Sequence, residues 1–560
     1  MKYKNISPFI LILGLILTGC VNGFVNDNNA NVTVANIPFE NLSKQEYKIK
    51  NSDLKIYYID NGTVPYVDIL NFISTLDGYL DTSNIKYSIN KYNNQLTLYY
   101  NGQYPIIFNW EKNTIYADAA YYFIAYAKSI GNSSAYSNLK SSNAFYKFGG
   151  KGFSTDIGKY YFDILYHNDK CLIPLFFANT LFCSPNYYNV FYNGEHCYGY
   201  SGEINSLDGY YDNKFNGQSV SDDMRLAAVN SLLFTFDYLY GLKEDKGYSL
   251  FKNYINKDIY SLLWSNSSSD NYLGYKQIIY GLLDELHTRI DIPSYYCDPT
   301  VCKTTSADYG EFWTNYFSRR QTQKNLRQST LGGAIPVRYS DNIAIITFDE
   351  FLSGTTEQLF DENNHLKEDA WKYDTYYFMQ YCMNDIKTHN DVEEILIDLS
   401  LNGGGAVISI FKLLGFMTDE NIPYSTYDYA SNSYSIYHYQ VDIDGDGKYP
   451  NDAYSQYKWN LLTSLNTFSA ANTTASIFDE MRLGKIFGKK SGGGMCPIMP
   501  MVLADGTAIT ISSNNTIRYV VNNDGNRTFY SIEHGINPDV EVEYSDFYND
   551  SKLVEYLNNN

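Results

Sequence analysis

Two stretches of this sequence place a tight turn directly between an apolar strand and a helix, and this pattern constrains the fold more than any other feature. In the first, the apolar segment Glu394–Asp398 leads into Leu399-Ser-Leu-Asn-Gly-Gly-Gly405 and then into the helix-compatible segment Ala406–Phe416. In the second, an apolar run that begins at Leu461 ends at Thr467-Phe-Ser469, and another helix-compatible segment follows. Buried strands that alternate with helices predict a mixed α/β fold.

The position of Ser469, between a strand and a helix, exposes its side chain and directs free backbone N–H groups at whatever binds there. A serine in such a place can attack a carbonyl if a base lies near and if N–H donors hold the oxyanion. The glycines of the first turn let backbone amides approach a ligand closely. We therefore predict an oxyanion hole formed by the N–H group of Gly404 or Gly405 together with that of Ala470. A helix cap at Ser469 and a flexible turn at the glycines are the alternatives.

Five segments follow one another over roughly residues 220–550, and two of them contain these turns. They are Leu283-Asp-Glu-Leu-His-Thr288, Asp398-Leu-Ser-Leu-Asn-Gly-Gly-Gly405, Thr467-Phe-Ser-Ala-Ala471, Gly488-Lys-Lys-Ser-Gly-Gly-Gly494 and Ile532-Glu-His-Gly-Ile-Asn-Pro-Asp-Val540. In this order they resemble the motifs of the S41 serine peptidases, with Ser400 where that family has an arginine and Asn472 where an acidic residue is common. The resemblance implies a crotonase-like α/β catalytic domain and hydrolysis of peptide bonds in a peptide or protein substrate.

The branch of that family decides which residue acts as the base. The carboxy-terminal processing branch uses a Ser–Lys dyad with its lysine in a Gly-Lys-Gly turn, but the matching segment here, Ser491-Gly-Gly-Gly494, has no lysine. The chain instead resembles the tricorn-like and retinoid-binding-protein-like branch, in which a histidine is the base and a glutamate supports it. That resemblance implies Ser469 as the nucleophile, His287 as the general base and Glu533 as the acid that orients the imidazole.

The residue types fit these roles. Histidine has a pKa near the working pH, and a carboxylate fixes its tautomer and stabilises its charged form. Asp284 and Glu285 lie beside His287 in the sequence and are alternatives to Glu533 for the acid. The changes at Ser400 and Asn472 also leave open an alternative function, a catalytically inactive protein that binds peptides or a cell-wall polymer.

The first residues predict where the protein resides. Lys2 and Lys4 precede the apolar run Phe9–Leu17, which is too short to span a membrane as a stable helix. The run ends in Leu17-Thr-Gly-Cys20, which resembles the lipobox of bacterial lipoproteins, with Cys20 as the lipid-carrying first residue of the mature chain. We therefore expect a lipid-anchored, extracytoplasmic protein at the cell membrane. A cytosolic protein with a chance hydrophobic start is the alternative.

A length of 560 residues predicts two or three domains. Residues 55–71 and 163–179 share a pattern, an alternating strand and a polar turn before a proline and an apolar helix-like run, which indicates a duplicated β-β-α unit. From Ser221 to about Leu286 the pattern is helical. We predict a signal peptide at 1–19, a flexible tether at 20–48, a small duplicated α+β accessory domain at 49–205, a helical region carrying His287 at 215–330, and an S41-like catalytic domain at 331–555.

The charge and the cysteines limit the partners. A formal charge of −20 argues against a nucleic-acid partner, which would need basic patches, and the sequence does not determine the oligomeric state. Cys297 and Cys302 are close enough for a local disulfide, and Cys171, Cys183 and Cys197 for a bond in some pairing, although the thiols can also stay reduced. The sequence has no Cys-x-x-Cys pair with a matching pair of His or Cys residues, which argues against a structural zinc site.

We expect no catalytic cofactor, but one segment resembles a calcium loop. Asp442, Asp444 and Asp446 stand at alternate positions with a glycine sixth, as in an EF-hand-like loop. The twelfth position is Ala453, which lacks the usual bidentate carboxylate, although Asp452 is adjacent. A solvated Asp-Gly turn is the alternative. A bound calcium ion would order the loop and take no part in catalysis.

Overall fold

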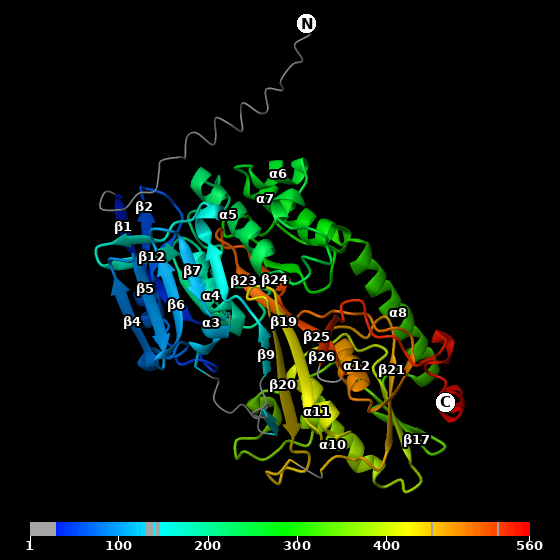
Figure 1. Ribbon diagram of the computed structural model, residues 1–560. Helices are drawn as coiled ribbons and strands as arrows, with labels where there is room; N and C mark the ends of the chain where they lie inside the picture. The colour runs from blue at the N-terminus through cyan, green and yellow to red at the C-terminus, as the bar shows by residue number, and fades with distance from the viewer. Residues whose placement is uncertain (1–29, 120, 129–137, 142–145, 450–451, 524–525) are drawn as a thin grey trace.

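The computed structural model describes residues 30–119, 121–128, 138–141, 146–449, 452–523 and 526–560 (Figure 1). The predicted signal peptide and the predicted lipid attachment at Cys20 lie outside these residues. The fold is mixed α/β, as the sequence predicted. Among the described helices, none combines the length and the hydropathy needed to cross a membrane.

The part of the chain predicted to be catalytic (the catalytic part) is built on one mostly parallel sheet. Its strands, in spatial order, are β16 (Val337–Ser340), β17 (Ile343–Thr347), β18 (Glu394–Asp398), β21 (Lys458–Thr463), β22 (Gly484–Gly488) and β27 (Val540–Glu541). β16 is antiparallel to β17, and the other neighbouring pairs are parallel. A parallel sheet is normally covered on both faces, which explains why β17 and β18 are buried along their whole length.

Helices cover this sheet on both faces. On one face lie α10 (Thr375–Ile386), α11 (Ile408–Gly415) and α12 (Ala470–Glu480), which share a core with Ile346 and Ile397. On the other face α13 (Asp550–Asn558) packs with Ile345 and Leu396. The two turns with predicted function follow β18 and β21, which are neighbouring parallel strands. Because the carboxyl ends of parallel strands meet at one edge, the fold brings the two turns together.

The N-terminal part forms two sheets within the described residues, drawn in blue and cyan in Figure 1. The first has, in order, β11 (Leu165–His167), β12 (Lys170–Pro174), β3 (Tyr66–Asp68), β2 (Ser52–Ile59), β1 (Val32–Asn41), β14 (Cys197–Ser201) and β13 (Tyr188–Tyr192). The second has β10 (Phe153–Asp156), β7 (Thr114–Ala117), β6 (Gln103–Asn109), β5 (Gln95–Tyr100) and β4 (Ile85–Asn90). The helices of this part are α2 (Ile69–Thr75), α3 (Tyr121–Ala125) and α4 (Leu175–Phe182).

The two segments that share a sequence pattern each form two strands and a helix, β2-β3-α2 and β11-β12-α4. β3 and β12 pair antiparallel, with Val67 opposite Ile173, so the two units meet inside one sheet. In both units the helix follows directly on the strand that carries or follows the proline. The common origin of the two units stays a prediction.

The prediction of a flexible tether is wrong for residues 32–41. These residues form β1, which is antiparallel to β2 on one side and parallel to β14 on the other. Ile37 and Phe39 are buried in the core. Buried and exposed residues alternate towards the end of β1, as is typical of a strand, but this alternation is difficult to recognise in an Asn-rich sequence. Pairing on both edges makes β1 an interior strand of the sheet.

The helical region contains α5 (Asp222–Phe234), α6 (Lys257–Leu263), α7 (Ser268–Lys276) and α8 (Glu311–Leu331). α5 begins directly after Ser221, as predicted. α8 runs from this region to the catalytic part, where it passes near the C-terminal helix (Figure 1). Cys297 and Cys302 form a disulfide. The other three cysteines considered above, Cys171, Cys183 and Cys197, are free and buried, so the reduced alternative applies to them.

Two further sheets join the parts of the chain. One consists of β15 (Arg289–Ile292), β24 (Ala508–Ser512) and β23 (Ile498–Val502). The other consists of β26 (Asn526–Ser531), β25 (Asn515–Asn523), β19 (Ile422–Asp428), β20 (Ser433–Val441) and β8 (Leu139–Ser141), with β9 (Tyr146–Gly149) also paired to β20. The first sheet ties the strand that directly follows the turn of His287 to β24 and β23. In the second sheet, β8 and β9 of the N-terminal part pair with β20 of the catalytic part.

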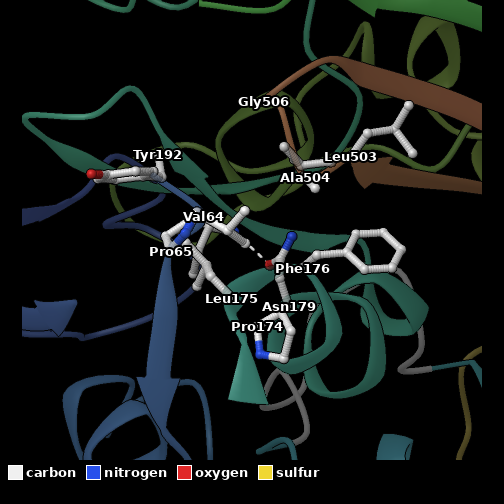
Figure 2. Close-up of a pocket in the computed structure, with 12 residues that line it drawn as sticks. Val64, Pro65, Pro174, Leu175, Phe176, Asn179, Tyr192, Leu503, Ala504 and Gly506 are labelled. Atoms are coloured by element: carbon white, nitrogen blue, oxygen red, sulfur yellow. Dashed lines mark hydrogen bonds between the residues drawn. The ribbon is translucent and has the colours of Figure 1, made fainter. Parts of the chain in front are cut away.

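The N-terminal part packs closely against the hairpin of β23 and β24. The hydroxyl of Tyr187 donates to the carbonyl of Ile498 (2.6 Å), and the amide of Asn189 donates to the carbonyl of Pro500 (2.9 Å). Figure 2 shows a cavity at this contact, between Leu175 on one side and Leu503 on the other. Its lining is mostly apolar and contains none of the predicted site residues.

Candidate active site

Ser469 occupies a strained turn between β21 and α12. Its backbone has φ 56° and ψ −120°, a conformation that residues other than glycine rarely adopt. Its N–H group donates to the carbonyl of Gly493 (2.9 Å), and its own carbonyl accepts from Thr473 in the first turn of α12. The side chain is half-buried. This turn therefore presents a hydroxyl at the start of a helix, where strain is retained only if the surroundings enforce it.

Gly404 closes against this turn. A Cβ atom on Gly404 would lie 2.7 Å from the Cβ of Ser469 and 3.1 Å from the nitrogen of Ala470, and the φ of Gly404 is +109°. The N–H group of Gly404 donates to the side-chain oxygen of Asn402 (2.9 Å). Among the described residues, the N–H groups of Gly405 and Ala470 have no hydrogen-bond acceptor. Of the predicted oxyanion donors, Gly405 and Ala470 are therefore the two with an available N–H.

The backbone around Gly405 is held by Phe351, which lies after β17. The N–H of Phe351 donates to the carbonyl of Gly404 (2.8 Å), and the N–H of Ala406 donates to the carbonyl of Phe351 (2.8 Å). A Cβ on Gly405 would lie 2.2 Å from that same carbonyl oxygen. Only glycine fits here, so the direction of the Gly405 N–H is determined by its surroundings.

His287 lies in the turn before β15 and faces the nucleophile turn through Phe468. The two ring centroids are 4.9 Å apart, and Phe468 directly precedes Ser469. The backbone N–H of His287 donates to the carboxylate of Glu285 (2.7 Å). Burial lowers the pKa of the His287 imidazole, and the nearby Glu285 carboxylate partly offsets this effect. The imidazole is thus neutral at neutral pH, which is the form that accepts a proton.

Glu533 lies on the loop that packs against Gly493 and Gly494, next to the nucleophile turn. Its backbone carbonyl accepts from the N–H of Gly494 (3.3 Å), and a Cβ on Gly493 would lie 1.8 Å from that carbonyl oxygen. Its side-chain Oε2 accepts from the N–H of Met495 (2.9 Å). Burial raises the pKa of Glu533 to about 8, with further contributions from the carboxylates of Glu285 and Asp245.

The backbone turns of the three predicted catalytic residues are in contact, since His287 packs on Phe468 and the carbonyl of Glu533 lies against Gly493, but the three side chains are not directly bonded. Within the described residues, no hydrogen bond joins the Ser469 hydroxyl, the His287 ring and the Glu533 carboxylate. Asp284, one alternative acid, caps the start of α8 by accepting from the N–H of Phe312 (2.8 Å). Glu285, the other alternative, is the carboxylate with the largest influence on His287.

The departures from the family motifs have structural roles. Asn472 in α12 donates to the carbonyl of Ile532 (3.0 Å) and accepts from the hydroxyl of Ser491 (2.7 Å), so it links the nucleophile helix to the loop of Glu533. The hydroxyl of Ser400 lies 3.0 Å from that of Tyr548, and both are buried.

Lys489, which precedes the segment where the processing branch has its lysine, is engaged elsewhere. Its ammonium group forms ion pairs with Glu543 (2.8 Å) and Glu541 (3.4 Å) near the end of the chain. These pairs are consistent with the expectation that this lysine serves no dyad.

Helix α8 contributes residues to the site that the sequence analysis missed. The hydroxyl of Tyr316 lies 2.9 Å from the place where a Cβ of Gly403 would be, and its ring is 6.1 Å from that of Phe468. One turn later, Arg320 donates to the carbonyl of Leu401 (3.1 Å). The spacing of the aromatic and basic residues along α8 was visible in the sequence, but nothing there indicated which face meets the glycine turn.

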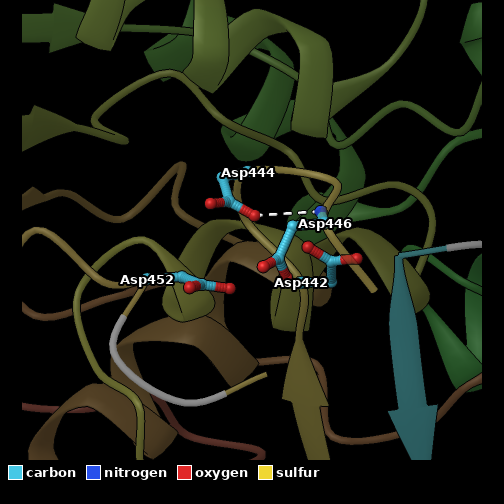
Figure 3. Close-up of side chains that lie close together, drawn as sticks. All are labelled: Asp442, Asp444, Asp446 and Asp452. Carbon is cyan, nitrogen blue, oxygen red and sulfur yellow. Dashed lines mark hydrogen bonds between the residues drawn. The ribbon is translucent and has the colours of Figure 1, made fainter. Parts of the chain in front are cut away.

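The predicted calcium loop brings four carboxylates together (Figure 3). One oxygen each from Asp442, Asp444, Asp446 and Asp452 lies within 4.8 Å of the others. Asp452 thus joins the three aspartates of the motif. The loop's own N–H groups already bind the carboxylate of Asp442, from Gly445 (2.7 Å) and Gly447 (2.9 Å). Burial raises the pKa of Asp452, and the three neighbouring carboxylates add to the shift. The calcium hypothesis stays a prediction.

The comparison with protein families agrees with the motifs. Residues 342–542 match the family model described as Peptidase family S41. This part of the chain is therefore similar to the S41 peptidases; it holds Ser469, Glu533 and both glycine turns, whereas His287 lies before it. None of the curated proteins matches the chain.

Solved structures match the chain at low identity and with TM-scores below 0.5. The photosystem II D1 C-terminal processing protease is 15% identical, with a TM-score of 0.25, over 36% of this chain and 42% of that one. A lipoprotein from Streptococcus agalactiae is 15% identical, with a TM-score of 0.34, over 60% of this chain and 97% of that one. The tricorn protease is 18% identical, with a TM-score of 0.22, over 44% of this chain and 20% of that one. The chain thus spans less than half of the first and third, and the family match alone carries the assignment.

Proposed function

We propose that this protein is a serine endopeptidase that cleaves a peptide or protein substrate by a Ser-His-Glu mechanism. The Ser469 oxygen bonds to the scissile carbonyl carbon while His287 takes the hydroxyl proton and then passes it to the leaving amine. The N–H groups of Gly405 and Ala470 hold the oxyanion. Glu533 stabilises the charged imidazole. Water then releases the acyl group by the same steps in reverse.

The strained turn at Ser469 carries this proposal. A serine with φ 56° and ψ −120° costs free energy that a plain helix cap would not need. Two N–H groups, those of Gly405 and Ala470, find no acceptor in the described part of the chain, and they flank the close contact between Gly404 and Ser469. A strained hydroxyl beside paired free donors is the arrangement that acyl transfer requires.

We propose Glu533 rather than Glu285 as the acid, because the oxygens of Glu285 already have partners. One accepts from the backbone N–H of His287 and the other from the hydroxyl of Thr288. The Oε1 atom of Glu533 accepts no hydrogen bond from the described residues. Catalytic hydrogen bonds often tighten only when substrate binds, so the separation of the three side chains is compatible with these roles.

A fluorophosphonate probe tests the enzyme against the alternative, a catalytically inactive protein that binds peptides or a cell-wall polymer. The probe should label the protein at Ser469, and Ser469→Ala should abolish the labelling. Ser464, which is buried in the loop directly after β21, offers a control, since Ser464→Ala should leave the labelled hydroxyl in place. A folded protein that binds peptide but never reacts with the probe would support the inactive binder.

For location and fold we propose what the sequence predicted. Cys20 carries the lipid anchor of an extracytoplasmic membrane lipoprotein, and a palmitate analogue fed to cells should label the protein but not Cys20→Ser. The S41 domain is crotonase-like, and the two β-β-α units of the N-terminal part descend from a duplication. An unlabelled wild-type protein that stays in the cytoplasm would refute the anchor.

A further inference from the structure

Lys412 is the one buried lysine in the part of the chain that the structure describes. It lies on α11, and its ammonium group forms an ion pair (2.8 Å) with the carboxylate of Asp374, the residue directly before α10. The two side chains are 3% and 1% exposed. A buried ion pair is often no more stable than apolar residues of similar size, because both charges lose their hydration. Stability alone therefore does not explain why this pair is present.

Asp374 also holds the backbone segment that follows β17. Its Oδ2 atom accepts from the N–H of Gly354 (3.2 Å) as well as from Lys412. Its Oδ1 atom accepts from the N–H of Tyr376 (2.8 Å) and so caps α10. One carboxylate therefore connects the start of α10, helix α11 and the segment after β17.

Leu352, two residues before Gly354, is held by the same two helices. Its carbonyl accepts from the N–H of Thr375 (3.0 Å) in α10 and from the hydroxyl of Ser409 (2.6 Å) in α11. Its N–H donates to the hydroxyl of Thr375 (2.9 Å). We call residues 351–354 the brace, because α10 and α11 together hold this segment in place.

The brace begins at Phe351, which holds the turn with the proposed oxyanion donor. Phe351 donates to the carbonyl of Gly404 and accepts from the N–H of Ala406, both at 2.8 Å. A Cβ on Gly405 would lie 2.2 Å from the carbonyl oxygen of Phe351, so the turn has no space to move towards the brace. The direction of the Gly405 N–H therefore depends on where the brace lies.

We propose that Asp374 and Lys412 are positioning residues, which set the direction of the Gly405 N–H through the brace. Lys412 supplies the counter-charge that a buried carboxylate needs, and Asp374 keeps the brace against the oxyanion turn. A hydrogen bond weakens steeply when its donor is misdirected, so a small shift of the brace reduces the stabilisation of the oxyanion. This inference rests on the proposed peptidase function and adds two residues that act on it from a distance.

A neutral replacement of the pair separates positioning from stability. Asp374→Asn combined with Lys412→Met removes both charges and leaves one oxygen to cap α10, but it removes the oxygen that accepts from Gly354. This double variant should keep its melting temperature within about 5 °C of the wild type. Lys412→Met alone leaves a buried charge without a partner and should lower the melting temperature by about 10 °C.

The first readout is hydrolysis of fluorescently labelled casein by the full chain. The double variant should lose roughly 10- to 100-fold in kcat with little change in KM, because the oxyanion forms only after the substrate has bound. Its labelling rate with the fluorophosphonate probe should fall by a similar factor. Lys276→Met combined with Asp308→Asn is the matched control, since this pair has the same residue types and the same 2.8 Å distance but lies in the helical region. That control should keep the wild-type kcat.

The second readout does not depend on catalysis. The N–H of Ala406 is bonded to the brace, so its hydrogen exchange reports whether the brace holds the oxyanion turn. Mass spectrometry of exchanged fragments should show about tenfold faster exchange at Ala406 in the double variant and no change in the control. Fragments from α13, on the other face of the sheet, should exchange as in the wild type in both variants, which shows that the fold is intact.

The outcomes separate the positioning role from the peptidase function. A double variant with wild-type kcat, or with wild-type exchange at Ala406, would overturn the proposal. A loss of kcat that the control shares would also overturn it, because the effect would then follow from lost charge in general. If the wild-type protein neither cleaves casein nor reacts with the probe, the peptidase function fails, and faster exchange at Ala406 would still support the hold of the pair on the turn. Wild-type exchange in that case would overturn both.

Discussion

The two halves of the candidate active site are held in different ways. The nucleophile half is built from backbone, since Gly404 presses on Ser469 and Gly493 accepts its N–H group. The histidine half is held by side chains and by long-range packing, because His287 rests on Phe468 and its turn is attached to β24 through β15.

This difference shows which half tolerates change. Backbone packing at van der Waals contact leaves no room for an added methyl group, so small substitutions in the nucleophile half should be severe. A side-chain contact between rings can shift by small rotations. We therefore expect the nucleophile half to determine whether the site exists, and the histidine half to determine how it responds to pH.

The largest effect is expected at the nucleophile. Ser469→Ala should reduce kcat by a factor on the order of 10⁶, by analogy with other serine peptidases. Ser469→Gly should be equally inactive but should gain about 1 kcal/mol of unfolding free energy, because glycine adopts φ 56° without strain. Peptide hydrolysis and chemical denaturation measure the two quantities. Substantial activity in Ser469→Ala would refute the assignment of the nucleophile half.

The acid of the histidine half comes next. Glu533→Gln should cost about 10⁴-fold in kcat if Glu533 orients the imidazole. Because the pKa of Glu533 is raised to about 8, the wild-type rate should increase as the pH rises through that value and the carboxylate ionises. The variant should lack this increase. A pH profile of kcat/KM measures it, and a matching loss in Glu285→Gln but not in Glu533→Gln would transfer the role to Glu285.

The same raised pKa makes a prediction for stability. A carboxyl group whose pKa is higher in the folded state favours folding at low pH, and this contribution is lost as the pH rises from about 4.5 towards about 8. Glu533→Gln should therefore become more stable relative to the wild type as the pH rises through that range. Denaturation midpoints at pH 5 and pH 9 test the sign.

A methyl group at Gly404 should displace Ser469 through steric overlap alone. Gly404→Ala places a Cβ 2.7 Å from that of Ser469, and displacement of the nucleophile by a fraction of an ångström should reduce kcat about 10²-fold or more. Gly217 has a similar positive φ but no atom within 4 Å of its added Cβ. Gly217→Ala should strain the backbone and leave peptide hydrolysis unchanged. Equal activity of the two variants would contradict the tight packing.

The link between the halves should have a smaller, mainly structural effect. Asn472→Ala removes the bonds to Ile532 and Ser491 and leaves buried partners unsatisfied, which should cost about 1–3 kcal/mol of unfolding free energy. Activity should fall less than in Gly404→Ala, because no catalytic group is removed. Thermal unfolding and hydrolysis rates measure both effects, and unchanged stability would exclude Asn472 as a link.

The smallest effect concerns the acidic loop, which lies outside both halves. If the loop binds calcium with a dissociation constant tenfold below the added concentration, the ion should stabilise the protein by about 1.4 kcal/mol without changing kcat. Asp444→Asn should reduce the stabilisation. No shift in the melting temperature with calcium would leave the solvated turn as the explanation.

The sequence predicted the placement of the two turns of the nucleophile half because its signals are local. The order of strand, glycine turn and helix can be read directly, and the structure brings Ser469, Gly404 and Gly405 together at neighbouring strand ends. The position of His287 came from the family resemblance, since its contact with Phe468 joins residues far apart in the sequence.

The misses have a common physical cause. β1 was missed because it is a strand through its pairing with β2 and β14. The Asn-rich sequence of the segment does not reveal these partners. The role of α8 was missed because the helix meets the glycine turn through tertiary packing. Propensity and periodicity describe segments, whereas contacts between distant segments require the fold.

The pairing of β8 and β9 with β20 has a consequence for how the protein can be divided. The outer edge of β20 is a row of backbone groups that strands from residues 139–149 satisfy. A chain shortened to begin after this region would leave that edge open, and open edges recruit strands from other molecules. The catalytic part therefore depends on the N-terminal part to cover this edge, and the two parts should be expressed as one unit.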